Sequence, residues 1–315
     1  MARYLDPKND LTFKRIFGEH PHLLINFLNA IMPFEKGRYI EEIQYLPTEL
    51  VPENPSKKDS IVDVRCKDNY QRQFIIEMQV FWQEAFYNRI IFNAGKAYVK
   101  QLDKKEDYNL LQPVYTLAIL NENFDHKTEN FYHYFQIVNR ENTEEVIPGL
   151  EFVLVELPKF CPQSWEHRKL AALWLRFLSE VDENMKSLPS ELQENEFIRQ
   201  AAELCEESAF TPEQLAVYDR YWDSVRIEKT IRNASLREGE EIGIEIGMKK
   251  GEEIGIKKGE VIGLEKGESI GEIKKTKKVV INSHHNGISV DMIATITNLT
   301  VEQVKEILKA HGIMI

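Results

Sequence analysis

The chain has 315 residues, 43% of them hydrophobic, which is enough apolar material for one large or two modest domains. Its formal net charge is −11, from 51 acidic and 40 basic residues. This balance excludes a generic nucleic-acid coat protein, which would be basic, but it allows an enzyme with a local basic groove.

The cysteines and histidines show no metal-ligand spacing. Cys66, Cys161 and Cys205 are isolated, and the adjacent His284 and His285 are not spaced as a ligand pair, which argues against a zinc site. An odd, unpatterned set of cysteines is typical of a reducing cytosol. The N-terminus lacks an apolar signal core, and no apolar run approaches ~18 residues. We therefore expect a soluble, cytoplasmic protein with no membrane partner.

Two short helices are predicted near the N-terminus. The first lies in residues 7–18, PKNDLTFKRIFG, where Phe13 and Phe17 fall on one helical face. The second begins at Pro21, because proline suits a first helical turn, and it ends before Pro33. Both helices present apolar faces and are expected to cover a core.

Residues 60–80, SIVDVRCKDNYQRQFIIEMQV, predict a β-hairpin around which the rest of the chain is organised. The β-branched, apolar segments 61–66 and 74–80 are separated by the polar segment 67–72, which suits a turn.

Alternation along the two strands separates an apolar face from a polar face. The apolar face is expected to hold Val62, Val64, Cys66, Phe74, Ile76, Met78 and Val80. The other face is expected to hold Asp63, Glu77 and Gln79, beside Ile61, Arg65 and Ile75. A turn centred on Tyr70 sets Asp63 opposite Glu77, close enough for both carboxylates to hold one cation.

Two interpretations of this carboxylate pair remain open. Carboxylates have poor β-propensity, and two that face each other repel unless a cation lies between them. Mg²⁺ is often held by one or two carboxylates plus substrate phosphates, so the pair indicates a metal site for phosphodiester chemistry. The alternative is the solvated outer face of an edge hairpin, where charged side chains are common.

Strands and helices are mixed in the segments around this hairpin. Strands are expected over residues 39–46, 113–120, 131–138 and 152–157, and a helix is expected over 81–102. The apolar run 113–120 is typical of a buried central strand. Together these elements predict an α/β (α+β) fold in which helices flank a mixed sheet.

Further helices are predicted over residues 164–178, 191–208 and 211–237. The last of these carries Tyr218, Tyr221 and Trp222, which we interpret as core residues rather than as platforms for stacked bases.

Residues 239–271 contain nine glycines at a strict period of four, separated mainly by Glu, Lys and Ile. Each interior glycine costs about 1 kcal/mol of helix stability relative to alanine, so an isolated helix would be marginal. A helix stabilised by self-association and a flexible, partly helical linker both remain open.

The tail, residues 274–315, predicts three short helices with tight turns. Ser289 and Thr300 are expected to cap helices over 290–297 and 301–310, and Gln303 would complete a capping box with Thr300. The arrangement resembles a helix-turn-helix module, and a small helical cap or a dimerisation element is the alternative.

Three motifs occur together in an order that resembles a known nuclease group. They are the segment 7–18, an Asp on one strand followed by Glu-x-Gln on the next (IIEMQ at 75–79), and the glycine repeat. The strand motif is similar to that of the PD-(D/E)XK nuclease superfamily, in which Glu-x-Lys is usual. The whole set resembles the Rpn group of recombination-promoting nucleases, also described as transposases. The resemblance covers the chain up to the repeat, and the repeat loosely.

The resemblance implies a restriction-endonuclease-like fold and four parts of the chain. These are a nuclease core at 1–160, a helical extension packed on it at 161–237, the glycine repeat at 238–273 and a helix-turn-helix-like tail at 274–315.

The resemblance also implies a DNA endonuclease that depends on Mg²⁺ or Mn²⁺ and acts in recombination or transposition. Asp63 and Glu77 would bind the metal, and Gln79 would orient the attacking water or a metal ligand in place of the usual lysine. In related nucleases a carboxylate on the first helix can join the metal site, and Asp10 is the matching residue. Its alternative role is to cap that helix.

Gln79 carries no charge, so the charge of the transition state must be offset by the metal or by a nearby cation. Lys14, Arg89 and Lys96 are the expected contacts to DNA phosphates, although each is equally typical of a solvated surface cation. The expected partners are DNA and, through the glycine repeat, further copies of the chain in a homodimer or oligomer. The alternative function is that of a non-catalytic descendant of the fold that binds nucleic acid or protein.

Overall fold

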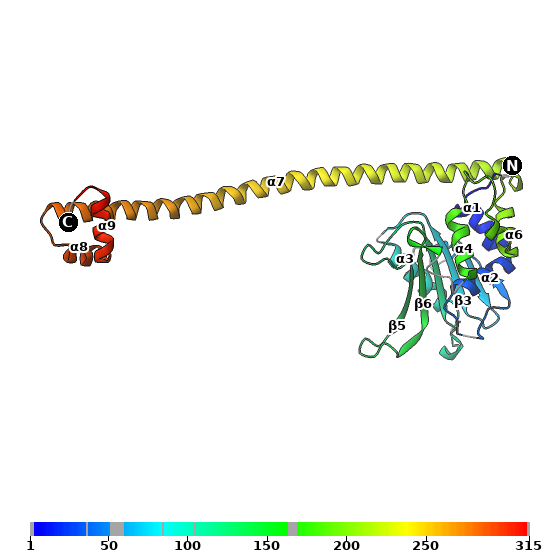
Figure 1. Cartoon of the computed structure of the whole chain (residues 1–315). Coiled ribbons are helices and arrows are strands. Elements are labelled where there is room, and N and C mark those ends of the chain that lie inside the picture. The colour runs from blue at the N-terminus through cyan, green and yellow to red at the C-terminus, as the bar shows by residue number, and fades with distance from the viewer. Residues whose placement is uncertain are drawn as a thin grey trace. The chain divides into compact units, whose positions relative to one another are not determined.

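The β-branched and apolar segments predicted as strands assemble into one six-stranded mixed sheet, in the order β1-β2-β3-β4-β6-β5 (Figure 1). The strands are β1 Ile43–Tyr45, β2 Val64–Asp68, β3 Gln73–Gln79, β4 Val114–Leu120, β5 Tyr132–Val138 and β6 Val146–Glu156. β4 runs parallel to both of its neighbours, β3 and β6, and the other pairs are antiparallel. The predicted α/β class with a mixed sheet is confirmed.

The computed structural model describes residues 3–35, 37–50, 60–83, 85–103, 105–162 and 169–313. The chain forms two units, Met1–Lys229 and Thr230–Ile315. The first unit contains the sheet, and the described part of the second is helical.

Helices of the first unit cover both faces of the sheet (Figure 1). They are α1 Asp10–Phe13, α2 Pro21–Ile31, α3 Ala85–Val99, α4 Lys169–Glu180, α5 Ser190–Gln193 and α6 Glu196–Leu204. The beginning of the helix predicted over 164–178 falls outside the described residues, and the described part is α4. None of the helices in the described part of the chain combines the length and apolar content that a membrane span requires.

Two separate apolar layers hold these helices to the sheet. On one face, α2, α4 and α6 pack against strand residues that include Phe74 and Leu117. On the other face, α3 packs through Ala94 against Ile75 and through Ile90 against Ala118. Because β3 contributes to both layers, its side chains are enclosed on both sides.

The β2–β3 hairpin has the predicted register. Val64 pairs with Ile76 and Cys66 pairs with Phe74, which centres the turn on Tyr70. However, the hairpin is not an edge, because β3 pairs along its whole length with β4. The alternative interpretation, a solvated outer face of an edge hairpin, is therefore wrong.

Val62 lies on the opposite face from the predicted one. It packs with Ile75 and Ala94 below α3, whereas Val64 joins the layer on the other side of the sheet. The reason is local: β2 begins only at Val64, and the backbone bends at Asp63. The alternation of side chains along the strand therefore does not continue across Asp63.

The longest helix is α7, Pro212–His285, which includes the whole glycine repeat. It is followed by α8 Val290–Thr297 and α9 Val301–Ala310, and the end of α7 packs on these two helices through Val280. The predicted capping box is present, since Thr300 and Gln303 exchange both hydrogen bonds. Ser289 precedes α8 as expected, but its side chain makes no capping hydrogen bond.

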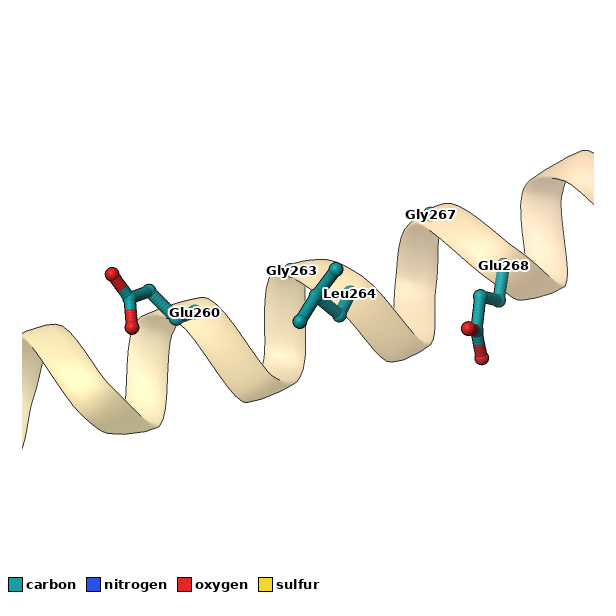
Figure 2. A pocket seen from close by; sticks show the side chains of 5 residues that line it. All are labelled: Glu260, Gly263, Leu264, Gly267 and Glu268. Carbon is teal, nitrogen blue, oxygen red and sulfur yellow. The ribbon is translucent and has the colours of Figure 1, made fainter.

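The side chains of the glycine repeat are exposed in the single chain. A Cβ added at any of the nine glycines would meet nothing within 4 Å, apart from the backbone of the helix itself. Figure 2 shows one stretch, in which Gly263 and Gly267 leave the helix bare beside the side chain of Leu264, which is 68% exposed. This part of α7 is held by its own backbone ladder and by exposed pairs such as Glu245 with Lys249.

Candidate active site

Asp63 lies at the bend immediately before β2, where the backbone pairing with β3 ends. If the register of Val64 and Ile76 continued, Val62 would pair with the backbone of Met78. Instead, Asp63 Oδ2 accepts a hydrogen bond from the Met78 N–H at 2.7 Å. The carboxylate thus satisfies a strand N–H that would otherwise need a backbone partner, and this holds it against β3.

Glu77 points from β3 toward α3 and is only 5% exposed. Its Oε1 accepts a hydrogen bond from Asn93 Nδ2 at 3.0 Å, and its Oε2 lies 3.4 Å from Nη2 of Arg89. Asn93 is itself buried, and its Oδ1 accepts a hydrogen bond from the Ser60 hydroxyl at 2.5 Å. These partners offset part of the cost of burying a carboxylate.

Burial raises the pKa of both carboxyl groups. For Asp63 the pKa rises to about 6, because burial and the negative charges of Glu77 and Asp10 outweigh the Met78 N–H and the positive charge of Lys14. For Glu77 burial also raises the pKa, against the opposing effects of Arg89 and Asn93. The ionised pair is therefore unfavourable in the folded protein, and a cation at this position would relieve it.

Asp10 is the first residue of α1, but it is not the cap. Asn9 holds that position, and its Oδ1 accepts the Leu11 N–H at 2.9 Å, so the alternative role considered for Asp10 is wrong. Instead, Asp10 Oδ1 pairs with Lys14 Nζ at 2.7 Å. Both charges affect the pKa of Asp63, in opposite directions. The N-terminal helix therefore brings this ion pair to the hairpin.

Gln79 is held at both ends of its amide. Its Nε2 donates to the carbonyl oxygen of Phe81 at 2.6 Å, and its Oε1 accepts a hydrogen bond from Arg89. The same guanidinium contacts Glu77, so Arg89 joins the two β3 side chains. A positive charge thus lies beside Gln79, where the usual motif would have a lysine.

Lys96 makes different contacts, although it lies on the same helix as Arg89. Its ammonium donates to the carbonyl oxygen of Leu50 at 2.9 Å and lies 4.7 Å from the ring centroid of Phe92. Of the three cations expected from the sequence, Lys14 and Arg89 are the two whose charge lowers the pKa of Asp63 or Glu77.

The sequence predicts Tyr221 on α7 as a core residue, but the structure leaves this residue only partly buried. Burial raises its pKa, and the next causes are the negative charges of Asp10 and Asp63. Tyr218, by contrast, is buried in the core as expected. Helical spacing alone does not distinguish the two tyrosines, because only packing shows which one the core encloses.

The donor set suits a hard cation that is shared with a substrate. Within the described ranges, no group of three or more His, Cys, Asp or Glu side chains could hold a metal ion. Asp63 and Glu77 supply carboxylate oxygens, the ligands that Mg²⁺ and Mn²⁺ prefer. Mg²⁺ commonly takes one or two carboxylates and completes its coordination with water and substrate phosphates, so two carboxylates are sufficient for this type of site.

Comparison with known proteins gives one match. The model of a family described as PD-(D/E)XK nuclease family transposase matches residues 7–229, which include every site residue from Asp10 to Tyr221. The match ends before the glycine repeat. Neither the curated proteins nor the solved structures gave a match.

Proposed function

We propose, from the premise that the chain belongs to the PD-(D/E)XK nuclease family transposases, that it is a cytoplasmic DNA endonuclease that depends on a divalent metal and acts in recombination or transposition. One observation carries the proposal. Asp63 and Glu77 are held together at the central hairpin, with the pKa of both carboxyl groups raised. An arrangement that is unfavourable without a cation supports a cation-binding role.

In this proposal Asp63 and Glu77 hold Mg²⁺ or Mn²⁺, and Asp10 is the third carboxylate within electrostatic reach. The metal would polarise the phosphate and lower the pKa of the attacking water. The Met78 N–H and the Asn93 amide each hold one carboxylate oxygen in place. Such fixed orientation reduces the rearrangement needed when the substrate binds.

We infer that Arg89 supplies the positive charge that Gln79 lacks. Its guanidinium already contacts Gln79 and Glu77, and it comes from α3 rather than from β3. A cation at this position stabilises negative charge that develops on the phosphate. Lys14 is the second cation of the site, and the two are the proposed contacts to DNA phosphates.

The glycine repeat supports a further part of the proposal, a homodimer or oligomer that brings two nuclease units together. Apolar side chains of the repeat, such as those of Ile254, Ile262 and Leu264, are each at least half exposed in the single chain. A helix this rich in glycine gains from packing, because its intrinsic helix propensity is low. Two nuclease units would allow cuts in both DNA strands.

The alternative, a non-catalytic descendant that binds nucleic acid or protein, is favoured by one observation. Arg89 already lies 3.4 Å from Glu77, so an ion pair partly replaces the charge that a metal would bring. Metal binding discriminates between the two functions. A nuclease requires the cation at Asp63 and Glu77, whereas a descendant that relies on the ion pair does not.

The test uses the full chain and a supercoiled plasmid, with Mg²⁺, with Mn²⁺ and with EDTA. We expect cleavage with either metal, none with EDTA and none for Asp63→Asn. Asp125→Asn is the matched control, because Asp125 is an exposed acid outside the site. Calorimetric titration with Mg²⁺ is the second readout. We expect Mg²⁺ to bind the wild type and to bind Asp63→Asn more weakly. Equal Mg²⁺ binding by the wild type and Asp63→Asn would contradict the site assignment.

A further inference from the structure

The first turns of α7 are tied to the sheet unit at two places. At the first, the Tyr218 hydroxyl accepts a hydrogen bond from the Asp6 N–H at 2.9 Å and donates one to Glu183 at 2.8 Å. At the second, Glu228 accepts a hydrogen bond from Gln83 Nε2 at 3.2 Å. The segment 218–228 belongs to the same unit as the sheet, so its position there is defined.

Both anchors adjoin residues of the carboxylate site, and at the first one Asn9 Nδ2, next to Asp10, donates to the Tyr218 carbonyl oxygen at 3.5 Å. Asp6 lies four residues before Asp10 in the sequence, and Gln83 lies four residues after Gln79. Ten residues of α-helix between the anchors span ~15 Å. Gln83 and Arg89 also line an open cavity of about 470 Å³, so there is space beside the site for a substrate.

Tyr221 lies between the two anchors, and its ring is held by a contact with Trp222 at 5.5 Å between centroids. Trp222 in turn packs on the small core around Leu5 and Tyr218. The Tyr221 hydroxyl makes no hydrogen bond with the residues that the structure describes, whereas the Tyr218 hydroxyl makes two. Burial and the nearby carboxylates raise the Tyr221 pKa, so the hydroxyl keeps its proton at neutral pH. The site therefore contains a neutral donor with no protein acceptor.

We propose that Tyr221 is a substrate-contacting residue whose hydroxyl donates a hydrogen bond to a non-bridging oxygen of the phosphate at Asp63 and Glu77. The inference rests on the proposed nuclease function and completes its site from α7. Lys14 is paired with Asp10, and Arg89 is paired with Glu77. A neutral donor adds stabilisation of phosphate charge without competing with the metal for a carboxylate.

The family match extends into the first turns of α7. The last strand, β6, ends at Glu156, yet the match continues to residue 229. The matched range therefore includes the first turns of α7 and Tyr221.

The test compares Tyr221→Phe with the wild type in the full chain. Tyr70→Phe is the matched control, because Tyr70 is 47% exposed at the hairpin turn, beyond the far end of β2 from Asp63. We expect Tyr221→Phe to unfold at the wild-type temperature and to lose about ten- to a hundredfold in kcat/KM for DNA cleavage with Mg²⁺. Tyr70→Phe should match the wild type. Unchanged kcat/KM in Tyr221→Phe overturns the inference.

A binding measurement separates this inference from the proposed function. Both Asp63→Asn and the double variant Asp63→Asn with Tyr221→Phe are titrated with a fluorescein-labelled DNA duplex in Ca²⁺. We expect about three- to tenfold weaker binding when the hydroxyl is absent. If the wild type cuts DNA with neither Mg²⁺ nor Mn²⁺, the nuclease proposal fails, and this titration alone decides the inference. Weaker binding then supports a nucleic-acid contact of Tyr221, and equal binding overturns it.

Discussion

The central hairpin and the glycine repeat gain their structure in opposite ways. β3 pairs with strands on both sides and is covered by helices on both faces. The repeat of α7 has only its helical backbone ladder, and its side chains are exposed. Almost all that holds the hairpin comes from distant parts of the sequence, and almost all that holds the repeat in the single chain is local.

This difference determines where unfavourable residues are tolerated. The hairpin retains the buried Glu77 beside the partly buried Asp63, because its packing and hydrogen bonds offset their mutual repulsion. The repeat has no such surplus, since each glycine weakens the helix and its side chains are exposed, with only surface pairs such as Glu245 and Lys249 described along it. A substitution in the hairpin should therefore change chemistry more than structure, and a substitution in the repeat should change structure and association.

The largest expected effect is on the hairpin. Glu77→Gln removes a charge from the proposed metal site but keeps an amide of the same size between Asn93 and Arg89. We expect plasmid cleavage to fall by about a hundredfold or more while the circular dichroism spectrum is unchanged. Glu151→Gln, at a buried carboxylate of β6, is the control for a loss of buried charge. Full cleavage by Glu77→Gln would remove Glu77 from the mechanism.

The second prediction concerns the repeat. Gly255→Ala with Gly259→Ala should stabilise the helix by about 2 kcal/mol in total, because alanine has the higher helix propensity and each added Cβ has free space. If the glycines allow two helices to approach closely, the same change weakens self-association. Light scattering after size exclusion measures the mass, and hydrogen exchange measures the helix.

A matched control places alanine on neighbouring positions, with Lys257→Ala and Lys258→Ala. These changes leave every glycine in place. A wild type that is monomeric at tens of micromolar would end the proposal of self-association through the repeat. A double glycine variant that associates as well as the wild type would show that close approach at these two positions is not required.

The third prediction uses the raised pKa of Asp63. In the folded chain its pKa is about 6, whereas an unfolded Asp titrates near 4. The folded state therefore holds the proton more tightly, and this carboxyl group makes the fold progressively less stable as pH rises from about 4 to about 6. Asp63→Asn keeps an acceptor for the Met78 N–H, so above pH ~6 it should be more stable than the wild type by about 1–2 kcal/mol.

Urea unfolding across this pH range measures the effect without any metal present. Asp125→Asn is a control of opposite sign, because the Lys127 N–H and the Thr128 hydroxyl lower the pKa of Asp125. That variant should show no gain in stability at neutral pH. If the free energies of unfolding of the wild type and Asp63→Asn differ by the same amount at acidic and at neutral pH, Asp63 does not titrate as described.

The smallest effect is expected for the charge beside Gln79. Gln79→Lys would place a second cation against Arg89, which now donates to the Gln79 amide oxygen. We expect about a tenfold loss of cleavage, and recovery when Arg89→Met is added, because one cation then remains. Steady-state cleavage rates of the two single variants and the double variant give the comparison. A fully active Gln79→Lys variant would contradict the proposal that Arg89 already supplies the positive charge at this position.

Several features of the fold were predictable because they depend on neighbours in the sequence. Strand alternation and the polar turn predicted the hairpin register from Val64 to Lys67, although not the bend that precedes it at Asp63. The capping box at Thr300 was predictable for the same reason, since both of its partners lie within one turn. The family motifs and the α/β class also followed from local patterns.

Other features depended on contacts between distant segments. The bend at Asp63 moved Val62 to the other face, because the carboxylate satisfies the Met78 N–H in place of the strand backbone. The sequence places Asn9 and Asp10 side by side, and only the backbone geometry selects Asn9 as the cap.

The sequence by itself determined which residues could carry the chemistry: Asp63, Glu77, Gln79 and the cations near them. The tertiary structure decided that the hairpin is central rather than an edge, that Arg89 rather than Lys96 joins Glu77, and that Tyr218 is buried in the core while Tyr221 is only partly buried. The physical reason is the range of the interactions. Alternation and capping act over a few residues, whereas burial and charge pairing depend on which segments the whole fold brings together.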